Sequence, residues 1–165
     1  MIPGYDIARA THEDIDGILD LQDRNQPDRG GTLSARFSRD WFGSALAAMP
    51  VIVCRREGRV VGYLASSPLS AHAEVPVVQA MLAAYRGKPG AYVYGPICVD
   101  EVERGRGLAS AMFEALRDRL PRREGVLFIR SDNTASLGAH TRMGMRQVAD
   151  FTDGDAAYAV FSYAG

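Results

Sequence analysis

Hydrophobic and polar positions along the chain follow two different periods, which separate expected strands from expected helices. Apolar runs rich in β-branched and aromatic residues predict strands at residues 5–10, 51–56, 59–66, 92–99, 126–130, 146–152 and 157–163. Apolar residues at three- and four-residue spacing predict helices at residues 12–23, 34–49 and 108–120, with one more inserted within residues 67–90. The sequence has no internal repeat, low-complexity tract or interdomain linker, so we expect one domain.

Local signals mark several ends of these elements. Thr11 is a typical helix N-cap, and Asp14 stands three residues later, where a capping box usually carries Glu. Pro50 ends the second helix, because proline cannot continue the helical hydrogen-bond pattern. Glu57 and Gly58 separate two β-rich runs and therefore predict a hairpin.

The most informative segment is residues 97–109, where an apolar strand ends in an Arg- and Gly-rich turn and a helix begins. Gly105 and Gly107 allow a tight turn without side chains, so successive backbone amides can point at an anion. The helix that follows adds its first amides and the positive end of its dipole. Arg104 and Arg106 can supply countercharge. The segment therefore predicts a phosphate-binding loop.

A dinucleotide-binding loop is one interpretation of this pattern, and it fits incompletely. The motif G-x-G-x-x-G/A would start at Gly105, but Ser110 occupies its last position. Such a motif belongs to the first strand–helix–strand unit and is followed by an acidic residue after the next strand. Here the motif lies past the midpoint of the chain, and Glu124 comes before the next expected strand.

The second interpretation is the motif R-x-x-G-x-A, which Arg104, Gly107 and Ala109 satisfy. Ile97 and Val99 form the apolar-x-apolar strand end that precedes it. In spacing and setting, the segment resembles the coenzyme A pyrophosphate loop of the GCN5-related N-acetyltransferases, the GNAT superfamily.

A second segment carries the same resemblance independently. Residues 133–145 follow an expected strand and resemble the last conserved helix of that superfamily, commonly N-x-x-A/S-x-x-x-Y/H-x-x-x-G-F. Asn133, Ser136, His140 and Gly144 fall on this pattern in register, whereas methionine replaces its final phenylalanine. Two motifs in the right order, separated by one helix and one strand, seldom occur together by chance. The chain is thus identified as a member of the GNAT superfamily.

The resemblance implies a fold. We expect an α/β (α+β) protein with a mixed, mostly antiparallel sheet of six to seven strands, splayed at its central parallel pair and flanked by helices. In this fold the splay opens a V-shaped slot for the cofactor. Residues 1–165 would form a single N-acetyltransferase domain.

The resemblance also implies an acetyl-CoA-dependent N-acetyltransferase. An uncharged primary amine, expected to be that of a small molecule, would attack the thioester directly in a ternary complex. Strand backbone would bind the pantetheine, and the amides of residues 104–109 would hold the pyrophosphate. The residues expected to bind the cofactor are Ile97, Cys98, Val99, Arg104, Gly105, Arg106, Gly107, Leu108, Ala109, Asn133 and Ser136.

The catalytic candidates are His140 and Tyr94. His140 stands where many relatives carry a tyrosine that protonates the leaving thiolate, although a helix histidine can equally hydrogen-bond the backbone. Alternation along residues 91–99 places no carboxylate on the face shared with Ile97, so the base used by some relatives is missing. Tyr94 lies on the opposite face of the strand unless a bulge at Gly95 and Pro96 turns its side chain. Ordered water and Glu74 are the other candidate bases.

Charge and cysteine content exclude several classes of protein. A net charge of −1 argues against general binding to nucleic acids or anionic membranes. Cys54 and Cys98 show no metal-ligand spacing, so neither a metal site nor a disulfide scaffold is expected. The N-terminal sequence lacks a signal-peptide pattern and no apolar run approaches membrane-spanning length, so we expect a cytoplasmic protein. Homodimers are frequent among the proteins it resembles, but no surface here specifies one.

The acceptor is not determined by the sequence. In the resembled fold, acceptor specificity comes from segments that correspond here to residues 26–37 and 67–90, and Trp41 and Tyr85 are candidate pocket residues. Two other functions stay open: a protein or peptide N-acetyltransferase, and an acyl-CoA-binding sensor with little catalysis. The missing carboxylate favours the sensor. The lack of an acidic run in the acceptor segments argues against a basic peptide.

Overall fold

The structure is a computed structural model that describes residues 2–29 and 36–165. Contacts divide the chain into two compact units. The first unit comprises Met1–Ser67 and Gly95–Leu120, and the second comprises Pro68–Tyr94 and Pro121–Gly165. Strand β4 (Tyr92–Val99) contributes to both, because the boundary falls within it. The prediction of a single domain stays a prediction.

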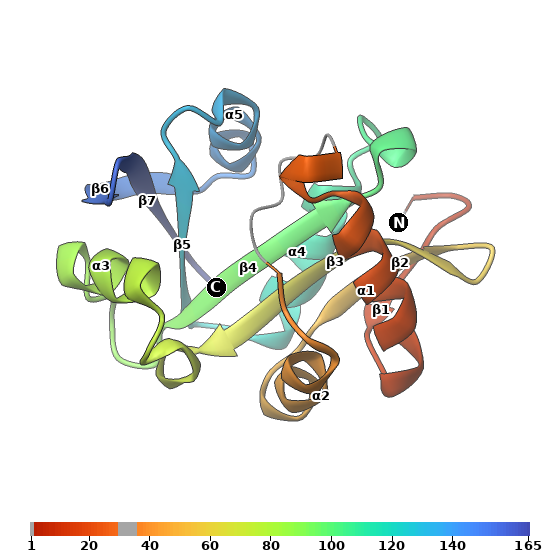
Figure 1. Ribbon diagram of the computed structural model, residues 1–165. Helices are drawn as coiled ribbons and strands as arrows, with labels where there is room; N and C mark the ends of the chain where they lie inside the picture. The colour runs from red at the N-terminus through yellow and green to blue at the C-terminus, as the bar shows by residue number, and fades with distance from the viewer. Residues whose placement is uncertain (1, 30–35) are drawn as a thin grey trace. The chain divides into compact units, whose positions relative to one another are not determined.

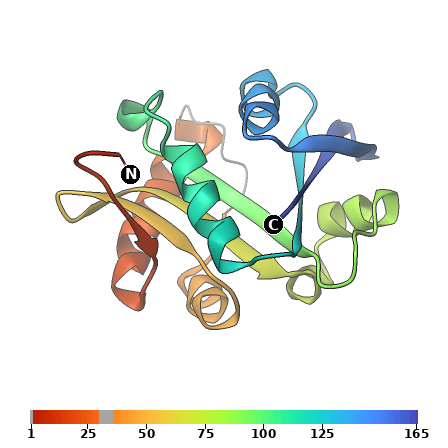
Figure 2. The same ribbon diagram turned by 180° about the vertical axis from the view of Figure 1, so that it is seen from behind.

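The first unit contains strands with helices on both faces. Its elements are β1 (Asp6–Arg9), η1 (His12–Asp14), α1 (Ile15–Arg24), η2 (Pro27–Arg29), α2 (Arg39–Ala48), β2 (Ile52–Arg56), β3 (Arg59–Pro68), the second half of β4, η4 (Glu101–Glu103) and α4 (Leu108–Arg119), where η marks a short 3-10 helix. β1 and β3 both pair antiparallel with β2, and β4 lies next to β3. α1 and α2 lie on one face of these strands and α4 on the other (Figures 1 and 2).

Local hydrogen bonds set the helix starts in the first unit. The amide of Thr11 donates to Oδ2 of Asp14 at 2.8 Å, which is the capping interaction that the sequence predicts. The hydroxyl of Ser38 accepts from the amide of Trp41 at 3.1 Å, so it caps α2. Residues 36–38 are not helical, and the predicted start at residue 34 is therefore too early. Residues 34 and 35 themselves lie outside the described residues.

The core of the first unit lies between the α1–α2 pair and the sheet. Its fully buried side chains include Ile18 of α1, Phe42 of α2 and Tyr63 of β3. Burying one isoleucine or phenylalanine side chain stabilises a fold by about 1.5–3 kcal/mol. On the opposite face, a Cβ at Gly62 would lie only 3.1 Å from Cε of Met112. This close packing holds α4, and with it the loop before α4, against the strands.

The second unit contains the end of the sheet and two helices. Its elements are η3 (Leu69–His72), α3 (Pro76–Ala84), the first half of β4, β5 (Glu124–Arg130), α5 (Thr134–Arg142), β6 (Arg146–Asp153) and β7 (Ala156–Ala164). α3 packs against β6, and the core includes Val78, Met81, Val126 and Val160. Among the helices of the described chain, none is long and apolar enough to cross a membrane.

Strand pairing in the second unit changes direction at β5. β5 pairs antiparallel with β7 along its whole length, and β7 pairs antiparallel with β6. β4 and β5 are parallel, and their registered pairs are Tyr92 with Gly125 and Val93 with Val126, at the start of both strands. Among the described residues the strand order is β1-β2-β3-β4-β5-β7-β6. The predicted fold class is therefore confirmed: over this part of the chain the structure has a mixed, mostly antiparallel sheet of seven strands that contains one parallel pair, β4 and β5, and is flanked by helices.

A buried carboxylate ties the start of β5 to its neighbours. Oε2 of Glu124 accepts hydrogen bonds from the hydroxyls of Tyr85 and Ser162 at 2.5 and 2.6 Å. Oε1 accepts one from the amide of Lys88 at 2.7 Å. Burial raises the pKa of Glu124, but these hydrogen bonds outweigh it and hold the pKa below its ordinary value. An ionised side chain thus anchors the inserted segment 67–90 to β5 and β7.

Three buried tyrosines, Tyr92, Tyr94 and Tyr163, form a cluster on β4 and β7. A Cβ at Gly125 would lie 2.2 Å from Cζ of Tyr163, so only glycine leaves room for that ring. The hydroxyls of Tyr92 and Tyr163 share a hydrogen bond of 2.5 Å. The ring of Tyr163 also packs edge-on against that of Tyr94, with 5.9 Å between centroids. We call these three residues the tyrosine cluster.

Candidate active site

The Arg- and Gly-rich loop of the first unit connects η4 with α4. Gly105 and Gly107 both have φ of +80°, a left-handed conformation that favours glycine. A Cβ at Gly105 would meet nothing within 4 Å, so backbone conformation and not crowding requires glycine there. Gly107 is the N-cap residue of α4. The two glycines thus give the loop its turn into the helix.

This turn leaves the first amides of α4 without acceptors inside the helix. The amide of Ala111 donates to the carbonyl of Gly107 at 3.0 Å and starts the helical pattern. The amides of Leu108, Ala109 and Ser110 precede it, and a glycine N-cap has no side chain to accept from them. With the positive end of the helix dipole, these amides favour an anion. The arrangement fits a diphosphate.

The guanidinium group of Arg104 is held by protein oxygens. Nε donates to the carbonyl of Val99 at 3.1 Å, and Nη2 donates to Oδ1 of Asn25 at 2.9 Å. Arg24 forms an ion pair of 3.0 Å with the buried carboxylate of Asp100. The end of α1 is thus bound to both sides of η4, and we call these contacts the α1 brace. The side chain of Arg104 thus bonds protein oxygens on both sides of the loop, and its role as countercharge for phosphate stays a prediction.

Arg106 belongs to a second set of contacts in the first unit. Its Nη1 donates to the hydroxyl of Tyr5 at 2.7 Å and lies 3.6 Å from Oε2 of Glu103. The same Oε2 accepts a hydrogen bond of 2.5 Å from Tyr5, while Arg56 donates to Oε1 at 2.7 Å. Hydrogen bonds from Tyr5 and Arg56 hold the pKa of Glu103 below its ordinary value. The loop is therefore supported by ionised side chains on a second side.

The predicted pantetheine-binding residues lie on β4 just before the loop. Ile97 and Val99 are half-buried, whereas Cys98 is 6% exposed and belongs to the core of the first unit. Burial raises the pKa of the Cys98 thiol to about 12, so a nucleophilic thiolate is not populated near neutral pH. The Cys98 side chain is a packing group. Cofactor binding by the backbone at these positions stays a prediction.

Asn133, Ser136 and His140 lie at the start and along one side of α5 in the second unit. Oδ1 of Asn133 accepts from the amide of Ser136 at 3.2 Å and caps the helix. Nδ1 of His140 lies 2.8 Å from the carbonyl oxygen of Ser136 and 3.2 Å from its hydroxyl. Because a carbonyl oxygen can only accept, Nδ1 carries a hydrogen. In the neutral ring, Nε2 is then the acceptor.

The hydroxyl of Tyr94 lies 3.1 Å from Nε2 of His140, so it donates to that nitrogen. The two side chains are 4% and 5% exposed. Burial lowers the pKa of His140 below its ordinary value, although the hydrogen bond to Ser136 opposes this, and burial raises the pKa of Tyr94. Near neutral pH the pair is therefore an uncharged phenol that donates to an uncharged imidazole. The structure brings together the two catalytic candidates.

The predicted site residues thus fall into two groups. The first unit contains the loop and the end of β4, and the second unit contains Tyr94 and the α5 residues. Sequence reasoning missed the supports of the loop, chiefly Asn25, Asp100 and Glu103. Their partners lie far along the chain, 79 residues away for Asn25, so no local pattern marks them. The acidic residues directly before RGRG were the one available signal.

The other acceptor and base candidates occupy different environments. The hydroxyl of Tyr85 donates to Glu124 and so has a structural partner. Glu74 is exposed. Trp41 is half-buried and stacks on Phe37, with 4.0 Å between ring centroids. Residues 30–35 of the predicted acceptor segment 26–37 lie outside the described residues.

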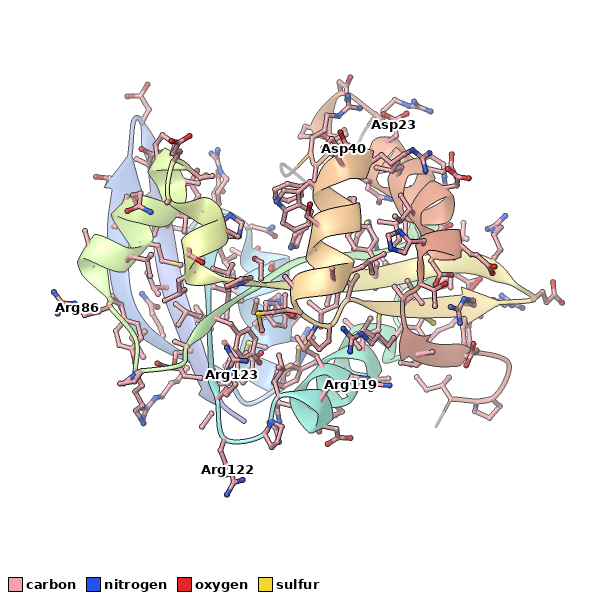
Figure 3. The ribbon with its side chains drawn as sticks, turned by 90° about the horizontal axis from the view of Figure 1, so that it is seen from below. Asp23, Asp40, Arg86, Arg119, Arg122 and Arg123 are labelled. Carbon is pink, nitrogen blue, oxygen red and sulfur yellow. The ribbon has the colours of Figure 1, made fainter. Side chains whose placement is uncertain are left out.

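Carboxylates of α1 are matched by arginines. Asp23, in the last turn of α1, and Asp40, in the first turn of α2, lie on the same side of the helical pair (Figure 3). The acidic side chains on the exposed side of α1 form the pairs Asp16–Arg39, Asp20–Arg24, Asp23–Arg29 and Asp23–Arg36. Across residues 2–29 and 36–165, no group of three or more His, Cys, Asp and Glu side chains could hold a metal ion.

Comparison with known families places the chain. The family model for the acetyltransferase (GNAT) family matches residues 15–145, which include both the loop and α5. The chain therefore belongs to the GNAT family of acetyltransferases. No curated protein matches it in sequence.

Solved structures share its fold at low sequence identity. An N-acetyltransferase from Staphylococcus aureus Mu50 is 20% identical with a TM-score of 0.68, covering 97% of this chain and 98% of that one. The Salmonella typhimurium protein yncA, solved with its cofactor acetyl-CoA, is 16% identical with a TM-score of 0.69, covering 98% and 94%. The Escherichia coli ribosomal-protein-S18-alanine N-acetyltransferase is 15% identical with a TM-score of 0.69, covering 97% and 93%.

Family membership confirms several predictions made from the sequence. The chain is an acetyltransferase, and its acetyl donor is acetyl-CoA. The acceptor and the roles of individual residues stay predictions.

Proposed function

We propose that this protein transfers the acetyl group of acetyl-CoA to the primary amine of a small molecule, by direct attack of the amine in a ternary complex. The observation that supports this most is the loop before α4. Two left-handed glycines there lead into uncapped amides at the start of a twelve-residue helix. Such an arrangement favours an anion such as a diphosphate.

The proposal assigns each part of the cofactor to a group of this chain. The amides of residues 104–109 hold the diphosphate, and the backbone of Ile97 and Val99 bonds the pantetheine amides as an added strand would. Asn133 and Ser136 add polar contacts. Bound acetyl-CoA supplies an activated thioester carbonyl. A backbone amide near Val99 donates to the oxyanion that forms during attack.

The charge pattern supports a small acceptor over a basic peptide. Relatives of this fold place the acceptor near the first helical pair. In this chain the acidic side chains of α1 there are paired with arginines. A neutralised surface does not concentrate a basic tail as an acidic groove would.

Two alternatives keep specific support. Acetylation of a protein N-terminus is favoured by the structural similarity to the S18-alanine N-acetyltransferase, at 15% identity. A sensor domain with weak catalysis is favoured by the lack of Asp and Glu in residues 91–99. Against the sensor, the buried Tyr94–His140 hydrogen bond supplies two groups that can move a proton.

The test combines binding and turnover. Calorimetry should show that the chain binds coenzyme A, and a thiol-release assay with acetyl-CoA should show acceleration by at least one small primary amine. The panel contains small amines, amino acids and peptides with a free N-terminus or a lysine. Acceleration by peptides alone would replace the acceptor class, and binding without any acceleration would favour the sensor. A folded chain that does not bind coenzyme A would refute the proposal.

Other features stay predictions of the same kind. They are a cytoplasmic location, a single domain over residues 1–165, a homodimer, and no binding to nucleic acid or membrane. Size-exclusion chromatography with light scattering would test the homodimer.

A further inference from the structure

We propose that Tyr94 and His140 form a proton relay. The Tyr94 hydroxyl exchanges protons with the reactants, and His140 temporarily holds the proton that Tyr94 passes to it. The inference rests on the proposed acetyl transfer and names the groups that move its proton. The sequence suggested His140 as the direct acid for the leaving thiolate. The hydrogen bonds of the pair instead make Tyr94 the proton donor and His140 the acceptor.

The proton positions follow from one backbone group. The carbonyl of Ser136 lies 2.8 Å from Nδ1 of His140 and fixes the hydrogen on that nitrogen. Nε2 then has only a lone pair, and it faces the Tyr94 hydroxyl at 3.1 Å. His140 cannot donate from Nε2 until it has first accepted a proton there. The hydroxyl of Tyr94 is the donor in position to deliver it.

The surroundings of the pair allow a short-lived imidazolium. His140 lies in the last turn of α5, where the negative end of the helix dipole favours a cation, while Arg142 in the same turn opposes it. The side chains near Tyr94 include the phenols of Tyr92 on β4 and Tyr163 on β7. Burial favours the neutral ring, so His140 returns its proton readily.

The reaction then balances without another reactant. The neutral amine nitrogen forms a bond to the thioester carbon, and the carbonyl electron pair moves to oxygen. The nitrogen loses a proton to the Tyr94 oxygen, while the Tyr94 hydroxyl proton passes to Nε2 of His140. The oxyanion then re-forms the carbonyl, and the carbon–sulfur bond breaks with its electron pair on sulfur. Tyr94 protonates the thiolate and recovers a proton from His140. The products are the acetylated amine, the thiol and the original pair.

The place of Tyr94 in the sequence supports its role as the group that meets the reactants. It lies on β4, three residues before Ile97, on the strand whose backbone is assigned to the pantetheine. His140 bonds Tyr94 through Nε2 and makes its other hydrogen bonds inside α5. A relay of this type also explains how the enzyme works with no carboxylate in residues 91–99. Tyr94 is thus a catalytic residue, and His140 acts through it.

Variants of the two residues test the relay. Tyr94→Phe removes the hydroxyl and keeps the ring, and His140→Gln keeps a hydrogen-bonding group that cannot store a proton. We expect each to lower kcat about 100-fold, the size of a lost acid–base contribution, with the double variant no worse than either single one. Affinity for coenzyme A, measured by calorimetry, should change less than twofold. Tyr158→Phe, a half-buried tyrosine of the same unit, is the matched control and should keep full activity.

The pH profile separates a relay from a structural contact. With kcat compared at saturating neutral amine, wild type should lose rate as pH falls through the pKa of His140, which lies below its ordinary value of about 6.5. His140→Gln should lack this loss. Nitrogen NMR of His140 in the coenzyme A complex should show Nε2 unprotonated at pH 7, and Tyr94→Phe should shift that resonance while Tyr158→Phe does not.

The outcomes distinguish this inference from the proposed function. If wild type acetylates an amine but Tyr94→Phe keeps kcat within threefold and retains the acid loss, the relay is wrong and acetyl transfer stands. A protonated Nε2 and unprotonated Nδ1 in the NMR measurement would also overturn the relay. If wild type binds coenzyme A and acetylates nothing, both the relay and the proposed function fail, whatever NMR shows about the hydrogen bond.

Discussion

The loop at residues 104–109 and the Tyr94–His140 pair differ in the kind of group assigned to their chemistry: main-chain groups in the loop and side chains in the pair. In the loop, the groups assigned to the ligand are main-chain amides, and side chains such as Arg104 brace them. In the pair, the reacting groups are side chains, and a main-chain carbonyl, that of Ser136, sets their protons. One site presents its backbone and the other presents its side chains.

This difference decides what each site tolerates. The amides of the loop are supplied by any residue, so its sensitive positions are the glycines that fix the turn. The pair joins residues 46 positions apart, so it depends on which strand residue packs against α5. We therefore expect conformation to control the loop, and the removal of single atoms to control the pair.

The largest expected effect is at Gly107. Gly107→Val forces a β-branched residue to φ of +80° and places methyl groups beside the first amides of α4. We expect affinity for coenzyme A to fall about 100-fold, which corresponds to about 2.7 kcal/mol, measured by calorimetry. The matched control is Gly90→Val in the second unit. Gly90 also has positive φ, +83°, and open space around a Cβ.

The control separates strain from binding. Both glycine variants should lose about 1–2 kcal/mol of stability, because both place a Cβ residue in left-handed backbone. Only Gly107→Val should lose affinity for the cofactor. Equal affinity in the two folded variants would show that the loop does not hold the diphosphate.

The sequence predicts the loop well because the loop is local. Strand β4, the two glycines and the start of α4 are consecutive, and their residue types alone determine the turn. The hairpin at Glu57 and Gly58 is predictable for the same reason, because its turn residues are consecutive. Both have a positive φ, +52° and +77°. The start of α2 is not predictable in this way, because the residues before Ser38 have similar helix propensity. The Ser38 cap that decides the start is seen only in the structure.

The sequence predicts the pair only in part. The motif places His140 on α5, but its hydrogens depend on contacts that no motif contains. Strict alternation along the strand predicts Tyr94 on the face opposite to that of Ile97. Gly95 between them has φ of +109°, outside the strand region, so the count does not carry across it. The partner of His140 is therefore visible only in three dimensions.

The second effect in size is at Gly125 and tests the support of the pair. Gly125→Ala would place a Cβ 2.2 Å from the ring of Tyr163, which is buried and hydrogen-bonded to Tyr92. We expect a loss of about 2 kcal/mol in the free energy of unfolding by urea, typical of overpacking. Because Tyr163 packs against Tyr94, kcat should fall as well, while affinity for coenzyme A stays within twofold. A loss of cofactor affinity with unchanged kcat would contradict the division of labour between the sites.

A smaller effect is expected at the α1 brace, and it tests whether side chains only support the loop. Arg104→Ala and Asn25→Ala should each weaken coenzyme A binding about tenfold, because each removes the same hydrogen bond to a charged group. The double variant should be no weaker than the Arg104 single variant. Arg119→Ala, at the other end of α4, is the control for lost charge and should bind normally.

The brace has a clear alternative. If Arg104 contacts phosphate directly, Arg104→Ala loses affinity while Asn25→Ala keeps it, and the two changes add in the double variant. That result would give the loop a side-chain ligand. The contrast with the Tyr94–His140 pair would then be one of degree.

The smallest effect is expected at Glu124 and concerns the side-chain contacts that hold β5. The folded-state pKa of Glu124 lies below its ordinary value, so ionisation of Glu124 stabilises the fold at neutral pH. This contribution is lost as pH falls through the folded pKa. At pH 7, Glu124→Gln should therefore be less stable than wild type by about 1 kcal/mol in urea unfolding, and the difference should shrink below about pH 4.5.

Glu114→Gln on α4 is the matched control, because Glu114 is exposed and lies 3.9 Å from Arg117. It loses the same charge without a buried network, so its stability should follow wild type at every pH. A difference for Glu124→Gln that stays constant from pH 7 to pH 3 would mean that its charge does not stabilise the fold. The hydrogen bonds from Tyr85 and Ser162 would then act on a neutral side chain, and the second unit would rely on hydrogen-bond geometry alone.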